Sequence, residues 1–106
     1  MSNDLKKDRL IDSFLSNLRL EKGLSENTIK AYSNDCYAFS KWLFSKKKYQ
    51  VLSATEKDIE NYLKHFHNSL LSHTSINRKL SSLKHFYYFL SKKKLLKSNP
   101  LVNFSG

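Results

Sequence analysis

Apolar side chains recur at intervals of three and four residues through most of this sequence, the spacing that places them on one face of an α-helix. The pattern predicts helices over about residues 7–22, 26–45, 55–67 and 72–90. Residues 24–99 contain neither glycine nor proline, and this absence favours helices over tight β-turns. The chain is therefore predicted to be all-α, with no significant β-sheet.

Residues with capping properties lie at the predicted helix boundaries. Gly23 follows the first helix, where a left-handed residue is favoured. Ser25 and Ser72 precede the second and fourth helices, where a hydroxyl can accept a hydrogen bond from a free backbone N–H. Thr55 and Asp58 have the spacing of a capping box, with aspartate in the place usually taken by glutamate or glutamine. These signals indicate separate helices joined by short connections.

The fourth predicted helix has two chemically different faces. Its apolar face is formed by residues at steps of three and four, namely Ile76, Leu80, Leu83, Tyr87 and Leu90. Its opposite face carries hydrogen-bond donors and no carboxylate, namely Asn77, Arg78, Ser81, Lys84 and His85. These groups can donate to phosphates or to base edges, and none of them repels a polyanion. We therefore expect this helix to contact the core on one side and nucleic acid on the other.

Positive charge dominates the second half of the chain. The 106 residues include 19 Lys and Arg against 9 Asp and Glu, which gives a net charge of +10. Every carboxylate side chain lies at or before Glu60, so residues 61–106 carry only basic charges. A strongly basic domain points to an acidic partner, either nucleic acid or an anionic membrane surface. A surface that serves solubility alone mixes both signs, so this half is predicted to bind an anion.

The single cysteine and the absence of long apolar segments indicate the cellular compartment of this protein. Cys36 is the only cysteine, so it can form neither an internal disulfide nor a thiolate metal cluster. The first residues lack the apolar run of a signal peptide, and no window approaches the ~18 apolar residues that span a bilayer. We expect a soluble protein of the reducing cytoplasm.

The sequence shows no arrangement of residues suited to catalysis or metal binding. His65 and His67 are two apart on a predicted helix, so they point in different directions. A tyrosine that attacks phosphate needs cations clustered around the phosphoryl oxygens, whereas the arginines are scattered along this chain. Three tyrosines are predicted to be core, Tyr32, Tyr62 and Tyr87, and two to be partly exposed, Tyr37 and Tyr88. No metal and no cofactor is expected.

Beyond the fourth helix the chain is predicted to form one more short turn and then to begin a linker. Residues 91–97 can add a short helical turn, with Leu95 and Leu96 packing back on the core. Pro100 stops the helix, since the residue before a proline is disfavoured in the α region. Residues 101–106 have the composition of the beginning of a linker.

Several groups of residues, taken in order, resemble a known family. The groups lie within residues 14–43, 55–63 and 75–90, and they end with the Asn-Pro pair at 99–100. Together they resemble the N-terminal core-binding domain of tyrosine recombinases, the Xer and phage integrase group. The resemblance covers roughly residues 8–102. Each group consists largely of caps and core positions, so the signal is carried by their order.

This resemblance implies an architecture and a set of partners. It implies a compact orthogonal, SAM-like bundle of four to five helices over residues 1–102, with residues 103–106 starting a linker to a catalytic domain absent from this chain. In the family the two domains close around double-stranded DNA, with the second and fourth helices facing the major groove. The implied partners are that DNA, the catalytic domain in cis and other recombinase protomers in a synaptic complex, with no membrane. The family's tyrosine chemistry belongs to the catalytic domain, so this fragment is not expected to be an enzyme.

Residues on two helices are predicted to contact DNA. Three lie in the first turns of the second helix, where free N–H groups and the helix dipole attract phosphate, namely Asn27, Thr28 and Lys30. The others lie on the fourth helix, namely Thr74, Ser75, Asn77, Arg78, Ser81, Lys84 and His85. The planar fork of Arg78 can reach two acceptors on a guanine edge, whereas Lys92, Lys93 and Lys94 are either phosphate contacts or a solvated helix end. A solvated charged face and a capping role for Thr28 are the simpler alternatives.

Other functions fit parts of the same pattern. A stand-alone helix-turn-helix-like DNA-binding regulator is possible because the third helix, a turn and the fourth helix follow one another. The length of the third helix and a turn without glycine argue against it. A membrane-surface binder would use the basic helices, but mutual burial explains their apolar stripes better.

Overall fold

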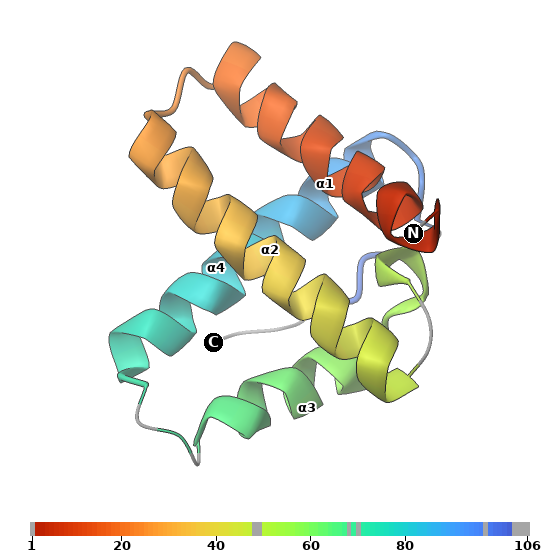
Figure 1. Ribbon diagram of the computed structural model, residues 1–106, viewed down its shortest axis with the longest axis vertical. Helices are drawn as coiled ribbons and strands as arrows, with labels where there is room; N and C mark the ends of the chain where they lie inside the picture. The colour runs from red at the N-terminus through yellow and green to blue at the C-terminus, as the bar shows by residue number, and fades with distance from the viewer. Residues whose placement is uncertain (1, 48–49, 68, 70, 97, 103–106) are drawn as a thin grey trace.

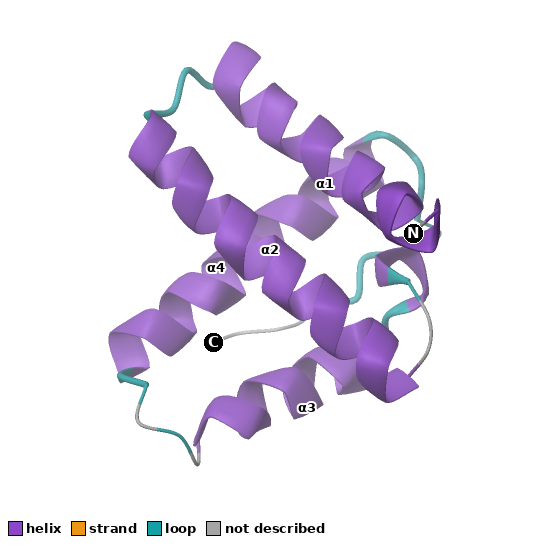
Figure 2. Cartoon of the chain, viewed as in Figure 1, coloured by secondary structure: helices purple, strands orange, loops and turns teal. Residues whose placement is uncertain are grey.

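The computed structural model describes residues 2–47, 50–67, 69, 71–96 and 98–102. The elements are α1 (Ser2–Leu20), α2 (Glu26–Lys47), a 3₁₀ turn η1 (Val51–Ser53), α3 (Glu56–His67) and α4 (His73–Lys92). Figure 2 shows helices joined by short loops, and the described part of the chain contains no strand. The predicted all-α helical bundle is therefore confirmed.

The helix α2 is the centre of the bundle. It packs against α1 along one side and against α4 on another, and Figure 1 shows α4 crossing behind it while α3 closes the lower end. The apolar stripes predicted from the sequence meet in one core, whose largest fully buried side chains include Phe14, Phe39, Tyr62, Phe86 and Tyr87. Among the described helices, none has both the length and the apolar composition needed to cross a bilayer.

The predicted caps form. Gly23 has a φ of +62°, the left-handed conformation that ends α1. The Ser72 hydroxyl accepts from the Ser75 N–H at 3.2 Å. Thr55 and Asp58 cap each other, because the Asp58 N–H donates to Thr55 Oγ1 at 3.2 Å and the Thr55 N–H donates to Asp58 Oδ2 at 3.0 Å. The shorter aspartate therefore completes a capping box.

The tyrosines divide between the core and the surface. Tyr62 and Tyr87 are buried, and the Tyr87 hydroxyl donates to the Val51 carbonyl at 2.7 Å, which ties η1 to α4. Tyr88 is 57% exposed. Tyr37 is half-buried, as predicted, and its hydroxyl donates to Asp12 on α1. Tyr32 was predicted to be core but is only half-buried, because its hydroxyl reaches out to a polar partner on α4.

The end of α4 differs from the prediction. No further helical turn follows Lys92, because Lys94 takes a φ of 60°. The backbone N–H of Lys94 donates to the Ser91 carbonyl at 2.9 Å, and the backbone N–H of Leu95 donates to the Leu90 carbonyl at 3.0 Å. This is the pattern of a Schellman cap with lysine in the place of glycine. Leu95 is therefore turned outward and exposed, whereas Leu96 packs against the core.

The chain returns to the bundle after this turn. The Asn99 side-chain oxygen accepts from the Leu101 N–H at 2.8 Å, and the Leu101 side chain is only 5% exposed. The prediction from composition that the linker begins at Leu101 is therefore wrong, because this residue belongs to the core. The remaining predicted linker residues, 103–106, lie outside the described part of the chain.

Replacing Leu101 with Ala should destabilise the domain, because it removes buried apolar contacts and leaves a cavity. We expect a loss of about 2–3 kcal/mol in the free energy of unfolding, measured by urea denaturation. The matched control is Val102→Ala, since Val102 is 73% exposed, and a change within about 0.5 kcal/mol is expected there. Equal small effects for both variants would show that the tail is not part of the folded core.

Candidate nucleic-acid interface

One side of α4 stays accessible along the whole helix. It is formed by residues three and four apart that carry hydrogen-bond donors and no carboxylate, namely Thr74, Asn77, Arg78, Ser81, Lys84, His85, Tyr88 and Lys92. We call these residues the donor face. Lys84 is half-buried and the others are exposed. The structure thus brings six of the seven α4 residues predicted to bind DNA onto one surface, and adds Tyr88 and Lys92.

Ser75 is the α4 candidate that lies apart. It is half-buried, and its side-chain oxygen accepts from the Ser72 hydroxyl at 3.2 Å within the N-terminal cap. Its role in this structure is to complete the start of α4. A contact between Ser75 and DNA stays a prediction.

A buried carboxylate lies beneath the donor face. Asp35 of α2 is 1% exposed, and it accepts from Arg78 Nε at 3.1 Å, from Arg78 Nη2 at 2.9 Å and from the Ser82 hydroxyl at 2.7 Å. Lys79 Nζ is 3.5 Å from the same carboxylate and 5.1 Å from the centre of the Phe66 ring. Two cations and a hydroxyl from α4 therefore surround one anion from α2, which satisfies the requirement that a buried charge be paired and hydrogen-bonded.

This pair changes the interpretation of Arg78. Its Nε and Nη2 groups, which form the fork predicted to meet a guanine edge, both point to Asp35. The hydrogen bond and the charge of Asp35 raise the pKa of Arg78, so the guanidinium is held more firmly in its charged form. The side chain remains half exposed, at 51%. In this conformation Arg78 positions α4 against α2, and any reading of a base by it would compete with Asp35.

The N-terminus of α2 is less uniformly basic than α4. Asn27 and Lys30 are exposed, and Thr28 is half-buried with its N–H donating to the Ser25 hydroxyl at 3.3 Å. The capping role expected for Ser25 is therefore confirmed. Glu26, one turn before Lys30, pairs with Arg19 Nε at 2.9 Å, and that hydrogen bond is the main cause of its lowered pKa. A carboxylate thus lies beside the predicted α2 contacts, unlike on the donor face.

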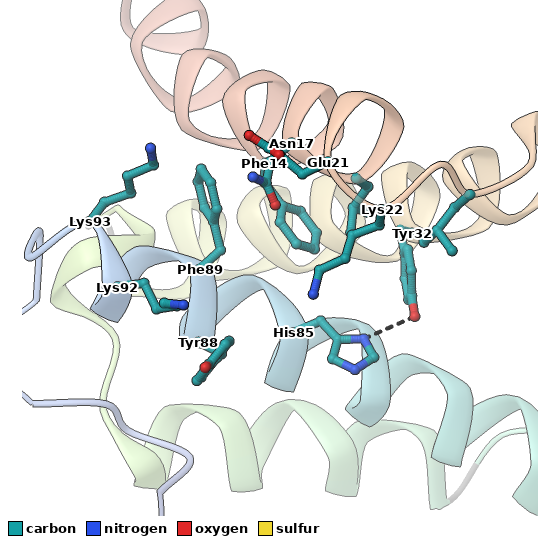
Figure 3. A pocket seen from close by; sticks show the side chains of 12 residues that line it. Phe14, Asn17, Glu21, Lys22, Tyr32, His85, Tyr88, Phe89, Lys92 and Lys93 are labelled. Carbon is teal, nitrogen blue, oxygen red and sulfur yellow. Dashed lines mark hydrogen bonds between the residues drawn. The ribbon is translucent and has the colours of Figure 1, made fainter.

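A hydrogen bond joins α2 to the donor face. The Tyr32 hydroxyl lies 2.9 Å from His85 Nδ1, and the two rings meet edge to face (Figure 3). Burial raises the pKa of Tyr32, so its hydroxyl keeps its proton. Thr28 lies one turn before Tyr32, on the same side of α2. The sequence did not predict this link, because Tyr32 falls on the apolar stripe of its helix and His85 on the polar face of another.

Other reactive groups are placed for structure. Burial raises the pKa of the Cys36 thiol, which keeps it protonated and unreactive. The ring of His65 packs against Phe66, with ring centres 5.0 Å apart. Within the described residues no three His, Cys, Asp or Glu side chains are grouped so that they could hold a metal ion.

Removing Arg78 should expose the cost of burying Asp35. In Arg78→Ala the carboxylate keeps only Lys79 and Ser82, so we expect a loss of about 2–3 kcal/mol in the free energy of unfolding, reduced from the usual value for a buried pair because Arg78 is half exposed. The double variant Asp35→Asn with Arg78→Ala should recover part of this loss, since the buried charge is gone. Urea denaturation measures all variants, and Asn77→Ala, exposed and adjacent, is the control. An Arg78→Ala variant as stable as that control would contradict the assigned role.

Comparison with known proteins identifies what this fold is related to. Residues 11–94 match the family described as the phage integrase N-terminal SAM-like domain. The chain is 36% identical to tyrosine recombinase XerC of Oceanobacillus iheyensis over 92 residues, which cover 87% of this chain and 30% of that protein. It is 37% identical to tyrosine recombinase XerD of Rickettsia bellii over 93 residues, 88% of this chain and 30% of that protein. For XerD of Proteus mirabilis the identity is 36% over 99 residues, 93% of this chain and 31% of that protein.

The comparisons agree with the resemblance read from the sequence. The chain spans only about 30% of the length of these relatives. A comparison with solved structures gave no match. Because the family match extends over most of the four-helix bundle, the chain belongs to the phage integrase N-terminal SAM-like domain family.

Proposed function

We propose that this chain is a duplex-DNA-binding domain of a site-specific tyrosine recombinase, and that the donor face of α4 lies in the major groove with the start of α2 beside it. The observation that carries the proposal is the donor face itself, a helix surface of five turns that offers donors and no carboxylate. The major groove of B-DNA is wide enough to admit an α-helix, and base edges and phosphates both accept hydrogen bonds.

The electrostatics of the bundle support this proposal. The acidic residues lie on α1, α2 and the start of α3, whereas residues 61–106 carry none. Asp35, the carboxylate beneath α4, is buried and paired with Arg78, so it presents no free negative charge to a polyanion. The exposed side of α4 therefore carries lysines and no free carboxylate, which favours binding to phosphate.

The residues of the donor face suggest a division of roles. Asn77 and Ser81 are exposed one turn apart near the Arg78–Asp35 pair, which holds this part of α4 in place. An asparagine can bond two atoms of an adenine edge, so Asn77 is the better candidate for base recognition once Arg78 is engaged. Lys84 lies one turn further along and acts as a point charge for phosphate.

The same proposal assigns partners and chemistry to a whole recombinase. We propose that cleavage and rejoining are performed by a catalytic domain in cis, and that other recombinase protomers join in a synaptic complex on DNA. We infer that such a protein works in the cytoplasm, where cellular DNA is accessible to it. Membership of the recombinase domain family favours this function over that of a helix-turn-helix regulator.

Binding of the isolated domain to duplex DNA should be weak and strongly dependent on salt. If roughly five phosphates are neutralised, log K should fall against log salt concentration with a slope of about −4 to −5. Fluorescence anisotropy with a labelled random duplex at several salt concentrations measures the slope. An affinity that does not change between low and moderate salt would contradict the proposal.

Replacing Asn77 should affect specificity more than total affinity. A duplex selected from a random pool by the wild-type domain serves as the specific site, and a scrambled duplex as the reference. We expect Asn77→Ala to reduce the affinity ratio between the two duplexes by about 5- to 100-fold, the loss of one base contact. Lys84→Ala should instead weaken binding to both about equally and flatten the salt slope by about one. An unchanged ratio in Asn77→Ala would remove Asn77 from base recognition.

A further inference from the structure

A groove runs along one edge of the donor face. It lies between the end of α1, the turn that follows it and the C-terminal half of α4, and it has a volume of about 750 Å³. Figure 3 shows Lys22 on the α1 side of the groove and His85, Tyr88 and Lys92 on the α4 side. Phe14 and Phe89, both mostly buried, form its floor. The groove is therefore continuous with the surface proposed to bind DNA.

The charges around the groove are mainly positive. Lys22 comes from one wall and Lys92 and Lys93 from the other, while Glu21 is the carboxylate among the described lining residues. An extended anion with repeating charges could contact both walls at once. The lysines would attract the negative charges of such an anion, and Glu21 would repel them.

Tyr88 gives the groove an apolar element as well. Its ring is 57% exposed, and Lys92 Nζ lies 5.6 Å from the ring centre, so the ammonium group and the ring are held beside each other. Tyrosine hydroxyls donate to phosphate oxygens in protein–DNA interfaces, and the body of the ring can cover the adjoining sugar. An aromatic ring next to a cation matches the alternation of sugar and phosphate along a DNA strand.

We propose that this groove seats the sugar–phosphate backbone of the strand that borders the major groove occupied by α4. Lys22 and Lys92 contact phosphates from opposite walls, and Tyr88 packs on the sugar between them and donates its hydroxyl to a phosphate oxygen. This inference rests on the proposed DNA-binding function and extends it to Lys22, a residue outside α2 and α4. An acidic segment of a protein is the other occupant that such charges fit, and the continuity of the groove with the donor face favours DNA.

The test compares single variants of groove residues with matched controls on a random duplex of roughly 25 base pairs, a length that spans more than two helical turns. Lys22→Ala and Lys92→Ala should each weaken binding several-fold and flatten the salt slope by about one. Glu21→Gln should strengthen binding about two- to threefold, because it removes the opposing charge. The controls are Lys57→Ala and Glu56→Gln on α3, which is not part of the groove, and these should leave the affinity unchanged.

Variants of Tyr88 change the affinity for DNA without changing the net charge of the domain. Tyr88→Ala should weaken binding about three- to tenfold with an unchanged salt slope, and Tyr88→Phe should lose only the part due to the hydroxyl. Circular dichroism tests whether each variant is folded. Because Tyr88 is exposed, we expect its replacement to leave the fold intact.

The possible results separate this inference from the function on which it rests. If Lys84→Ala weakens binding while the Lys22, Glu21 and Tyr88 variants bind as wild type, the domain binds DNA and the groove does not seat its backbone. That result would also be the one expected if the groove takes an acidic protein segment. If the wild-type domain does not bind duplex DNA at any salt concentration, both the proposed function and the groove assignment are wrong.

Discussion

The packing of this domain depends on one buried carboxylate. Asp35 lies in the interior between α2 and α4, and within the described residues its side chain accepts hydrogen bonds from Arg78 and Ser82, both on α4. Burying a charge without partners is far more costly than any single apolar contact is favourable. A slip of α4 by one helical turn along α2 would move both donors away while the apolar stripe still faced the core. The carboxylate therefore constrains the register of the two helices in a way that the apolar core alone does not.

The sequence predicted what depends on neighbouring residues and missed what depends on distant ones. The capping box of Thr55 and Asp58 could be predicted because both partners lie within one turn. Asp35 and Arg78 are 43 positions apart, and nothing local shows that the polar side of α4 supplies a partner to α2. A signal was present, since Asp35 precedes Cys36 on a stripe of core residues, where an unpaired carboxylate would not be tolerated. The linker-like composition of residues 101–106 was misleading at Leu101 for a similar reason, because only the path of the chain after the turn at Lys94 shows that this side chain is buried.

The same distinction applies to the candidate site. Helical periodicity was enough to place Asn77, Ser81 and Lys84 together on the donor face, because their positions follow from the geometry of one helix. The groove requires Lys22 to lie opposite Lys92, and this arrangement follows from how α1 packs beside α4. A sequence pattern along one element can therefore identify a binding face, whereas its edges and depth come from the packing of other elements.

The position of the buried pair also matters for what the donor face can recognise. A hydrogen bond to a base edge loses most of its energy when the distance or angle is wrong, so a side chain that reads bases needs a fixed backbone. Asn77 and Ser81 lie within one turn of Arg78, where Asp35 holds α4 against α2. Lys92 and Lys22 lie further away, but a flexible ammonium group needs no such precision to neutralise a phosphate. The fold thus places its buried carboxylate and the paired arginine beneath the residues suited to base recognition, and leaves long cations at the edge, where charge alone is sufficient.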